Sequence, residues 1–225
     1  MKKITFSILT IFAILFLAPQ FATAQLKQER IKASYLVAIG RLPTDAELNW
    51  WGQQNDYTVA QLVEAHRNYM NNTNKGSKAD PIKQSYFIAM GRTPSTGARS
   101  ETEYWTGRNE VAWEMVLQHV NYINQNKQLY DGVINNAYQK VFSKSASASE
   151  IAKWKNGTVR SFVELVYLLF NNPPAGYTVN PLAILEAMNT YKDFASVSFS
   201  DPVVQEIAAI TSGNDLFSKF KNGIR

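Results

Sequence analysis

The chain has 225 residues, no cysteine, and a formal net charge of +5 at pH 7. The absence of cysteine excludes disulfides, thiol catalysis, cysteine-ligated metal and a lipid-modified cysteine. The sequence pI is about 9.3, but the charges are scattered and no basic stripe interleaved with aromatic residues occurs. We therefore expect no nucleic-acid partner.

Residues 1–24 have the pattern of a signal peptide. Lys2 and Lys3 form a basic start, residues 4–17 are largely apolar, and the Ala-Thr-Ala ending at residue 24 fits the cleavage rule. The alternative is a retained anchor, for which the apolar run is short against about 30 Å of hydrocarbon. Cleavage before Gln25 removes two lysines and no acid, which lowers the net charge to +3. We expect an exported chain with no membrane-spanning segment, destined for the periplasm, the outer surface or the medium.

One pattern, spaced about 51 residues apart, occurs three times in the rest of the chain. Its copies begin at Tyr35, Tyr86 and Tyr138 with YLVAIGRLPTDAELNWW, YFIAMGRTPSTGARSETEYW and YQKVFSKSASASEIAKW. A period of this length is typical of stacked units that share one core. The sequence therefore predicts an all-α protein with three tandem three-helix repeats at residues 25–76, 77–128 and 129–176, followed by a helical C-terminal cap at 177–225.

The first helix of each copy is expected to end at a cap residue. Gly40 and Gly91 follow apolar segments and precede Arg-x-Pro, and glycine suits the left-handed conformation that ends a helix. The third copy has Ser143 at this position, so its turn is expected to be less sharply defined. Asp80-Pro81 is expected to start the first helix of the second copy as an N-cap followed by proline.

The second helix is expected to begin with a capping box in two of the copies. The pairs are Thr44 with Glu47 and Ser147 with Glu150, in which hydroxyl and carboxylate satisfy free N–H groups reciprocally. The second copy has a short insertion and Ala98 at the cap position, so we expect it to lack the box. A tryptophan follows the glutamate of each copy, and we expect these tryptophans in the core: Trp51, Trp105 and Trp154.

The predicted third helices of the three copies align with one another without gaps. Residues 58–72 align with residues 111–125 and with residues 158–172. In the first copy the predicted apolar stripe is Val59, Leu62, Val63, His66, Tyr69 and Met70. His66 and His119 share one position, which this alignment gives to Val166 in the third copy. We therefore expect packed histidines rather than metal ligands or acid–base groups.

The string Y-x4-G-R-x-P followed by an aromatic pair occurs as Tyr35, Gly40, Arg41, Pro43 and Trp50-Trp51, and again as Tyr86, Gly91, Arg92, Pro94 and Tyr104-Trp105. The third copy keeps only Tyr138, Lys144 in place of arginine, and Trp154. The pattern resembles a bacterial family of extracellular repeats of unknown function that is similar to the phycobilisome linker polypeptide domain. The resemblance implies small all-helical modules, often attached to surface, adhesin-like or carbohydrate-active proteins, with no assigned catalysis.

Three aromatic residues are the candidate ligand or partner surface: Trp50, Tyr104 and Trp113. Trp50 and Tyr104 share a slot with Lys153, and Trp113 is aligned with Ala60 and Arg160, so both slots are expected to face water. Exposed rings beside Asn and Gln suit stacking on sugars or anchoring a protein. The alternative is partial burial of these rings against a neighbouring unit.

Catalysis finds little support in the sequence. A glycosidase would need two carboxyls on one cleft, whereas stacked copies would separate Glu47, Glu101 and Glu150. No hydrolase, phosphate-loop or zinc signature occurs. The arginines of the motif are expected to pair with the last carbonyls of each first helix, or alternatively to form a cationic row: Arg41 and Arg92, with Lys144 in the third copy.

We expect a non-catalytic binding or scaffolding protein of the bacterial envelope, with a protein or glycan partner and no cofactor or metal. The alternative is an accessory glycan-active enzyme that uses scattered carboxylates. A third hypothesis, a lipid-like ligand between the helices, rests only on the abundance of apolar residues.

Overall fold

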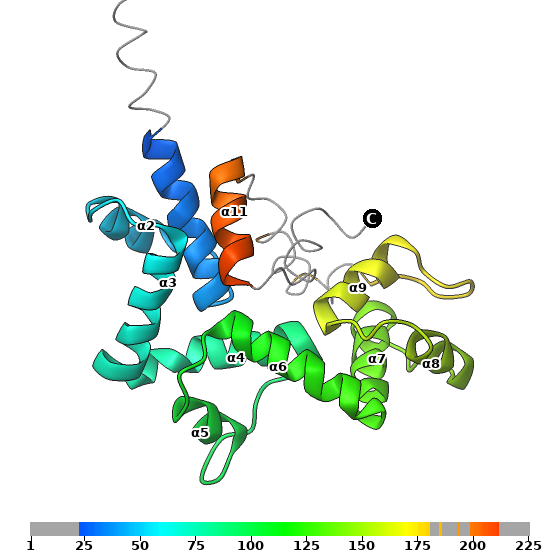
Figure 1. The fold of residues 1–225 in the computed structure, drawn as a ribbon. Helices are drawn as coiled ribbons and strands as arrows, with labels where there is room; N and C mark the ends of the chain where they lie inside the picture. Colours follow the sequence, from blue (N-terminus) through cyan, green and yellow to red (C-terminus); the bar gives the residue numbers. More distant parts are fainter. Residues whose placement is uncertain (1–22, 181–184, 186–192, 194–198, 212–225) are drawn as a thin grey trace, which may run out of the picture.

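In the computed structural model, residues 23–180, 185, 193 and 199–211 are described, and all regular structure in this part of the chain is helical (Figure 1). The all-α prediction is therefore confirmed for the described residues. The first 22 residues, which hold most of the predicted signal peptide, lie outside them, as do most residues of the C-terminal cap predicted at 177–225. None of the described helices combines the length and hydropathy that crossing a bilayer requires.

A long helix, a short helix and another long helix follow one another three times along the chain. The first set is a helix over residues 23–38, α2 (Asp45–Gly52) and α3 (Val59–Asn68). The second set is α4 (Ala79–Met90), α5 (Glu101–Thr106) and α6 (Ala112–Gln125). The third set is α7 (Lys127–Phe142), α8 (Ala148–Lys155) and α9 (Phe162–Asn171). A π-helical turn (Tyr69–Thr73) and a 3-10 turn (Lys75–Lys78) join α3 to α4.

The first helix of every set ends at a residue in the left-handed conformation. Gly40 has φ +86° and Gly91 has φ +68°, as the sequence predicts. The expectation of a blurred end in the third copy is wrong, because Ser143 adopts φ +56° and donates its N–H to the Gln139 carbonyl at 2.9 Å. A non-glycine residue in this conformation costs roughly 1–2 kcal/mol, so the surrounding packing must hold Ser143 in place.

The start of α4 differs from the prediction by two residues. The helix begins at Ala79 with Lys78 as its N-cap, so Asp80 lies in the first turn instead of capping it. Lys78 is buried, and its amine donates to the Asn71 Oδ1 at 2.8 Å and to the Arg108 carbonyl. These bonds tie the connection before α4 to the loop before α6, and the acid in the first turn still complements the helix dipole.

The end of each first helix lies against the start of the third helix in the next set. A Cβ built on Gly40 would lie 3.5 Å from the Ala112 Cβ, at the start of α6. A Cβ built on Gly91 would lie 2.3 Å from the Phe162 ring, at the start of α9, and this ring packs edge-on against Phe87 with centroids 5.6 Å apart. Glycine is thus required at Gly91 for close approach as well as for its positive φ.

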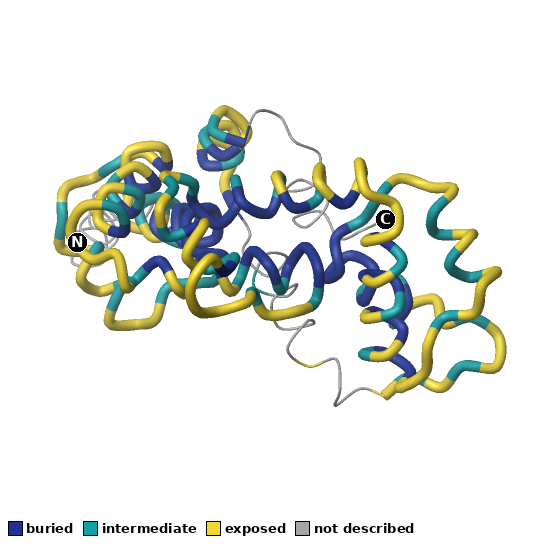
Figure 2. The backbone as a smooth tube through the Cα atoms, turned by 90° about the horizontal axis from the view of Figure 1, so that it is seen from below, coloured by how far each residue is buried: buried dark blue, intermediate teal, exposed yellow. Residues whose placement is uncertain are grey.

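Buried side chains from all three sets belong to one hydrophobic core. Figure 2 shows the buried positions along the middle of an elongated molecule, with exposed positions on the outside. Helix α4 occupies a central place, because it packs against α6 of its own set and also against α9 of the next. The core is therefore continuous from one set of helices to the next.

The C-terminal helix α11 (Asp201–Ile210) packs against α3 of the first set (Figure 1). The Glu206 carboxylate accepts from the Arg30 guanidinium at 2.7 and 2.9 Å and from the Val59 N–H at 2.7 Å. The Ser200 N–H donates to Glu29 Oε2 at 2.7 Å. The sequence predicted a cap that follows the third copy, whereas this helix covers the opposite end of the array.

The loop after α9 lies against the exposed end of the third set. The Tyr177 ring packs on Phe142 and Tyr138, with centroids 4.8 and 5.6 Å apart. The Asn180 N–H donates to the Val141 carbonyl at 2.8 Å. The segment after the third copy therefore contacts both ends of the array, first through Tyr177 and then through α11.

Candidate functional site

The same hydrogen bond joins the first and second helices of every set. The indole N–H of the motif tryptophan donates to the hydroxyl of the motif tyrosine, at 3.2, 3.1 and 3.3 Å in the three sets. Trp105 is buried, and the other two tryptophans are partly buried against the core. The prediction that these tryptophans belong to the core is confirmed for Trp105, and the other two pack against the core without being buried in it. The bonded pairs are Trp51 with Tyr35, Trp105 with Tyr86, and Trp154 with Tyr138.

The motif arginines bind the glutamate at the start of the second helix. Arg41 donates two hydrogen bonds to Glu47, at 2.8 and 2.9 Å, and Arg92 donates two to Glu101, at 2.8 and 2.6 Å. The expected pairing with the last carbonyls of the first helix is wrong, because a planar guanidinium matches both carboxylate oxygens at once. In the third set, Glu150 instead accepts from the Tyr177 hydroxyl at 2.8 Å.

The second copy retains a reciprocal cap despite its insertion. The Ser95 N–H donates to Glu101 Oε2 at 2.9 Å, and the Glu101 N–H donates to Ser95 Oγ at 3.0 Å. The expectation that this copy lacks the capping box at its helix start is confirmed. Ser95, which follows the motif proline as Thr44 does, nevertheless makes the equivalent pair of hydrogen bonds with Glu101. The inserted residues loop out between Ser95 and Glu101, and Ser100 caps α5 through the Glu103 N–H at 3.1 Å.

These contacts keep the glutamates ionised. The hydrogen bonds from Arg41 lower the pKa of Glu47 to about 2, and those from Arg92 lower the pKa of Glu101 to about 2. A carboxyl with so low a pKa cannot act as a general acid near neutral pH. Glu47 and Glu101 belong to different sets of helices, so they do not form one catalytic pair. In each of these two sets the carboxylate binds the second helix to the end of the first helix.

Glu101→Gln is expected to destabilise the protein by about 1–2 kcal/mol, a range that allows for the exposed third of this side chain. The folded-state pKa is lowered, so the stabilisation is present above about pH 4.5 and is lost as the pH falls towards 2. Urea unfolding at pH 7 and pH 3 would show the difference shrinking in acid. An unchanged unfolding free energy at pH 7 would contradict this structural role.

The two histidines are packed, as the sequence predicts. His66 and His119 are 6% and 4% exposed, and their Nε2 atoms lie 3.3 Å from the Ser34 and Ser85 hydroxyls. Burial lowers the pKa of each histidine to about 4. Among the residues that the structure describes, no group of three or more His, Cys, Asp or Glu side chains could hold a metal ion.

The gapless alignment of the third helix is wrong in the third copy. Helix α9 begins after Ser161, whose hydroxyl accepts from the Glu164 N–H at 3.3 Å, just as Thr58 caps α3. Ser161 is separated from Thr58 by the same number of positions as Ser147 is from Thr44. The third copy is therefore shifted by one helical turn relative to the alignment, and Leu169 replaces Val166 as the counterpart of the histidines.

This shift explains the error on Trp113. The gapless alignment pairs Trp113 with Arg160 and therefore predicts an exposed Trp113 ring. In the alignment that pairs Thr58 with Ser161, the counterpart of Trp113 is Val163. Trp113 is 2% exposed and Val163 is 1% exposed. Trp113 is therefore a core residue and no part of a ligand surface.

The other two candidate residues have exposed rings, and two further tyrosine rings are exposed as well. Trp50 is 55% exposed and Tyr104 is 56% exposed. Tyr69 and Tyr122, which share one slot, are 50% and 54% exposed, although the sequence placed Tyr69 on the apolar stripe. In the corrected alignment the counterpart of both tyrosines is Asn172. A polar residue at this position indicates that the position faces water.

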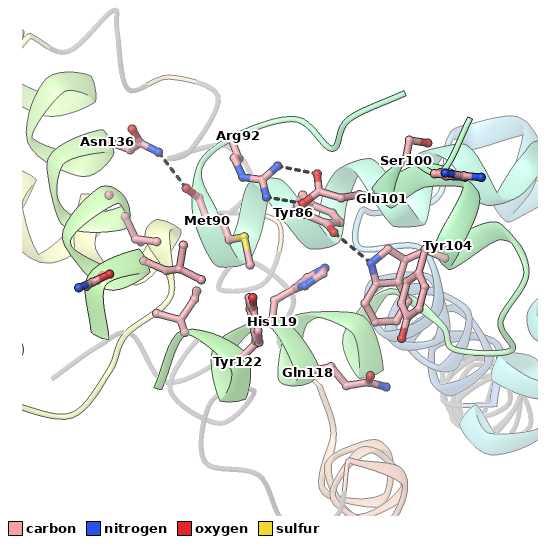
Figure 3. Close-up of a pocket in the computed structure, with 17 residues that line it drawn as sticks. Tyr86, Met90, Arg92, Ser100, Glu101, Tyr104, Gln118, His119, Tyr122 and Asn136 are labelled. Atoms are coloured by element: carbon pink, nitrogen blue, oxygen red, sulfur yellow. Dashed lines mark hydrogen bonds and ion pairs between the residues drawn. The ribbon is translucent and has the colours of Figure 1, made fainter. Parts of the chain in front are cut away.

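An open cavity of about 750 Å³ lies between the second set and α7 of the third set, and it is lined by two of these rings (Figure 3). Tyr104 comes from α5, Tyr122 and Gln118 come from α6, and α7 supplies Leu129 and Asn136. Figure 3 shows Tyr104 and Asn136 on opposite sides, with His119 between them. We call this cavity the α5–α7 groove.

The groove combines aromatic, amide and charged side chains. Arg108 donates to the Tyr104 hydroxyl at 2.9 Å and lies 5.1 Å from the centre of its ring, which fixes the ring in place. Arg92 and Glu101 neutralise each other at the rim, and Arg99 also lines the groove. Arg99 has φ +58°, a strained conformation of the kind that occurs at ligand sites.

Comparisons of the chain with protein-family models, with curated proteins and with solved structures gave no match.

Proposed function

We propose that this chain is an exported, non-catalytic binding or scaffolding protein of the bacterial envelope, built from tandem three-helix repeats. The α5–α7 groove is its main ligand surface. The observation that carries the proposal is the exposure of Tyr104 and Tyr122 in an open groove, because isolated exposed rings are normal but convergent ones indicate a binding surface.

The repeat arrangement is supported by contacts that recur at equivalent positions. Each set has the tryptophan–tyrosine hydrogen bond and a left-handed cap after its first helix. In each set a glutamate of the second helix also accepts from the backbone N–H of a preceding serine or threonine: Thr44, Ser95 or Ser147. The pattern of residues 1–24 supports export, and the resemblance to extracellular repeats supports an envelope location.

A binding role is favoured over the alternative of a glycan-active enzyme. Glu47 and Glu101 are bound by arginines and stay ionised, and Glu150 belongs to a third, separate cluster. Both histidines are buried within their own sets. These glutamates and histidines, the groups best suited to acid–base chemistry, are therefore used in the scaffold.

Tyr104→Ala combined with Tyr122→Ala is expected to lower ligand retention by at least about tenfold. The unfolding free energy is expected to fall by no more than about 2 kcal/mol, because Tyr104 loses its contacts with Arg108 and Trp105. The measurement is retention of solubilised envelope polysaccharide and envelope protein on the immobilised protein, with urea unfolding in parallel. Lys153→Ala is the matched control, because it changes the same slot in the third set, where no ring is present.

Equal retention by the double variant and the Lys153→Ala control would contradict the proposal. Turnover of envelope glycans that is lost in Glu101→Gln without loss of stability would favour the enzyme instead.

A further inference from the structure

The exposed rings form two pairs at equivalent positions. Trp50 belongs to α2 and Tyr69 to the π-helical turn after α3, and Tyr104 and Tyr122 belong to α5 and α6. All four side chains are at least half exposed. The third set has lost both rings together, with Lys153 and Asn172 in the two slots. If packing between sets required these rings, they would be buried, so their repetition calls for an explanation outside the core.

Three of the four rings are held by neighbouring side chains, which lowers the entropy lost on binding. Trp50 packs edge-on against Trp51 with centroids 4.8 Å apart, and Tyr104 packs in the same way against Trp105 at 5.2 Å. In the first set, Asn74 donates to the Tyr69 hydroxyl at 3.3 Å. Trp50 and Tyr104 therefore rest on the motif tryptophans and Tyr69 is held by an amide, so most of the two surfaces is preformed.

Amide side chains lie near both pairs, and the α5–α7 groove carries little net charge. Gln118, Gln128 and Asn136 line the α5–α7 groove, where the Arg92–Glu101 pair leaves only the charge of Arg99. Gln54 and Asn74 lie beside the first pair. Aromatic faces suit the C–H faces of sugar rings, and amides both donate to and accept from hydroxyls. This combination favours an uncharged sugar over an anionic ligand.

We propose that the first set holds a second binding site, formed by Trp50 and Tyr69, and that the ligand of both sites is an uncharged linear polysaccharide. This inference rests on the proposed function and specifies its ligand. A protein partner presents a non-repeating surface, whereas a chain of identical sugars offers the same contact to both ring pairs. Two sites joined by a continuous helical core then bind a polymer with avidity that a short oligosaccharide does not gain.

Isothermal titration of the purified protein with hexasaccharides derived from cellulose, xylan, laminarin, starch and chitin tests this proposal. For the sugar that binds, we expect two molecules per chain. Trp50→Ala with Tyr69→Ala is expected to reduce this number to one, as is Tyr104→Ala with Tyr122→Ala, and the four changes together are expected to abolish binding. The corresponding polysaccharide should bind at least about tenfold more tightly than the hexasaccharide, and either pair of changes should remove that advantage.

Two controls separate loss of the rings from loss of the fold. Lys153→Ala should leave the stoichiometry at two. Tyr104→Phe and Tyr122→Phe keep the rings and should retain binding, and circular dichroism should show unchanged helicity in every variant.

The possible outcomes distinguish this inference from the function on which it rests. A stoichiometry of one that does not respond to Trp50→Ala with Tyr69→Ala overturns the second site and leaves the α5–α7 groove intact. Retention of a protein that depends on Tyr104 and Tyr122, with none of the hexasaccharides bound, overturns the polysaccharide and leaves a binding function. If neither a sugar nor a protein depends on these rings, both proposals fail.

Discussion

Gly91→Ala is expected to destabilise the protein by about 3–5 kcal/mol. The added Cβ would lie 2.3 Å from the Phe162 ring, which is almost fully buried and cannot turn away freely. Overpacking of this kind costs about 1–3 kcal/mol, and alanine at a positive φ adds a further cost of about 1–3 kcal/mol. Urea unfolding followed by circular dichroism would measure the loss.

Gly97→Ala and Gly176→Ala separate the two costs. Both glycines have a positive φ, at +104° and +83°, and a Cβ on either would meet nothing within 4 Å. These controls are expected to lose about 1–3 kcal/mol from backbone strain alone. If Gly91→Ala cost no more than the controls, the close approach of α4 to α9 would be refuted.

Acid is expected to destabilise the protein through its two buried histidines. The pKa of each is lowered from 6.5 to about 4 by burial, so the unfolded chain takes up protons first. The stability that these groups contribute is therefore complete above about pH 6.5 and is lost as the pH falls towards 4. At pH 5 the loss is expected to be about 2 kcal/mol per histidine.

His66→Leu with His119→Leu is expected to remove most of this loss, because leucine is the natural residue at position 169 in the third set. The Ser34 and Ser85 hydroxyls would remain satisfied by the Ile31 and Ile82 carbonyls at 2.8 Å. Urea unfolding at pH 7 and pH 5 compares the two proteins. An equally large drop in the double variant would contradict the assignment to these histidines.

The local signals in the sequence predicted most of the helix ends. Gly40 and Gly91 are the expected left-handed caps, and Thr44 and Ser147 form the expected capping boxes. These features depend on residues within one turn of each other, which is why the sequence reveals them. The Ser95 cap was missed because an insertion separates it from its glutamate.

The errors on the site came from register and from long-range contacts. The apolar run of α9 fits two alignments that differ by one turn, and only the Ser161 cap chooses between them. That choice decides that Trp113 is buried and that the Tyr69 and Tyr122 slot faces water. The return of α11 to the first set depends on Glu206 and Arg30, which lie far apart in the sequence and share no local pattern.

The most direct test of stacking between successive sets is a double-mutant cycle of Gly91→Ala with Phe162→Ala, measured as unfolding free energies. Alanine at position 162 reproduces the small residue that Ala112 provides at the start of α6. Because it removes the ring that the Gly91→Ala methyl would strike, the double variant is expected to be about 2 kcal/mol more stable than the sum of the single changes predicts. Additive effects, within about 0.5 kcal/mol, would show that the two positions do not touch and would contradict the stacked arrangement.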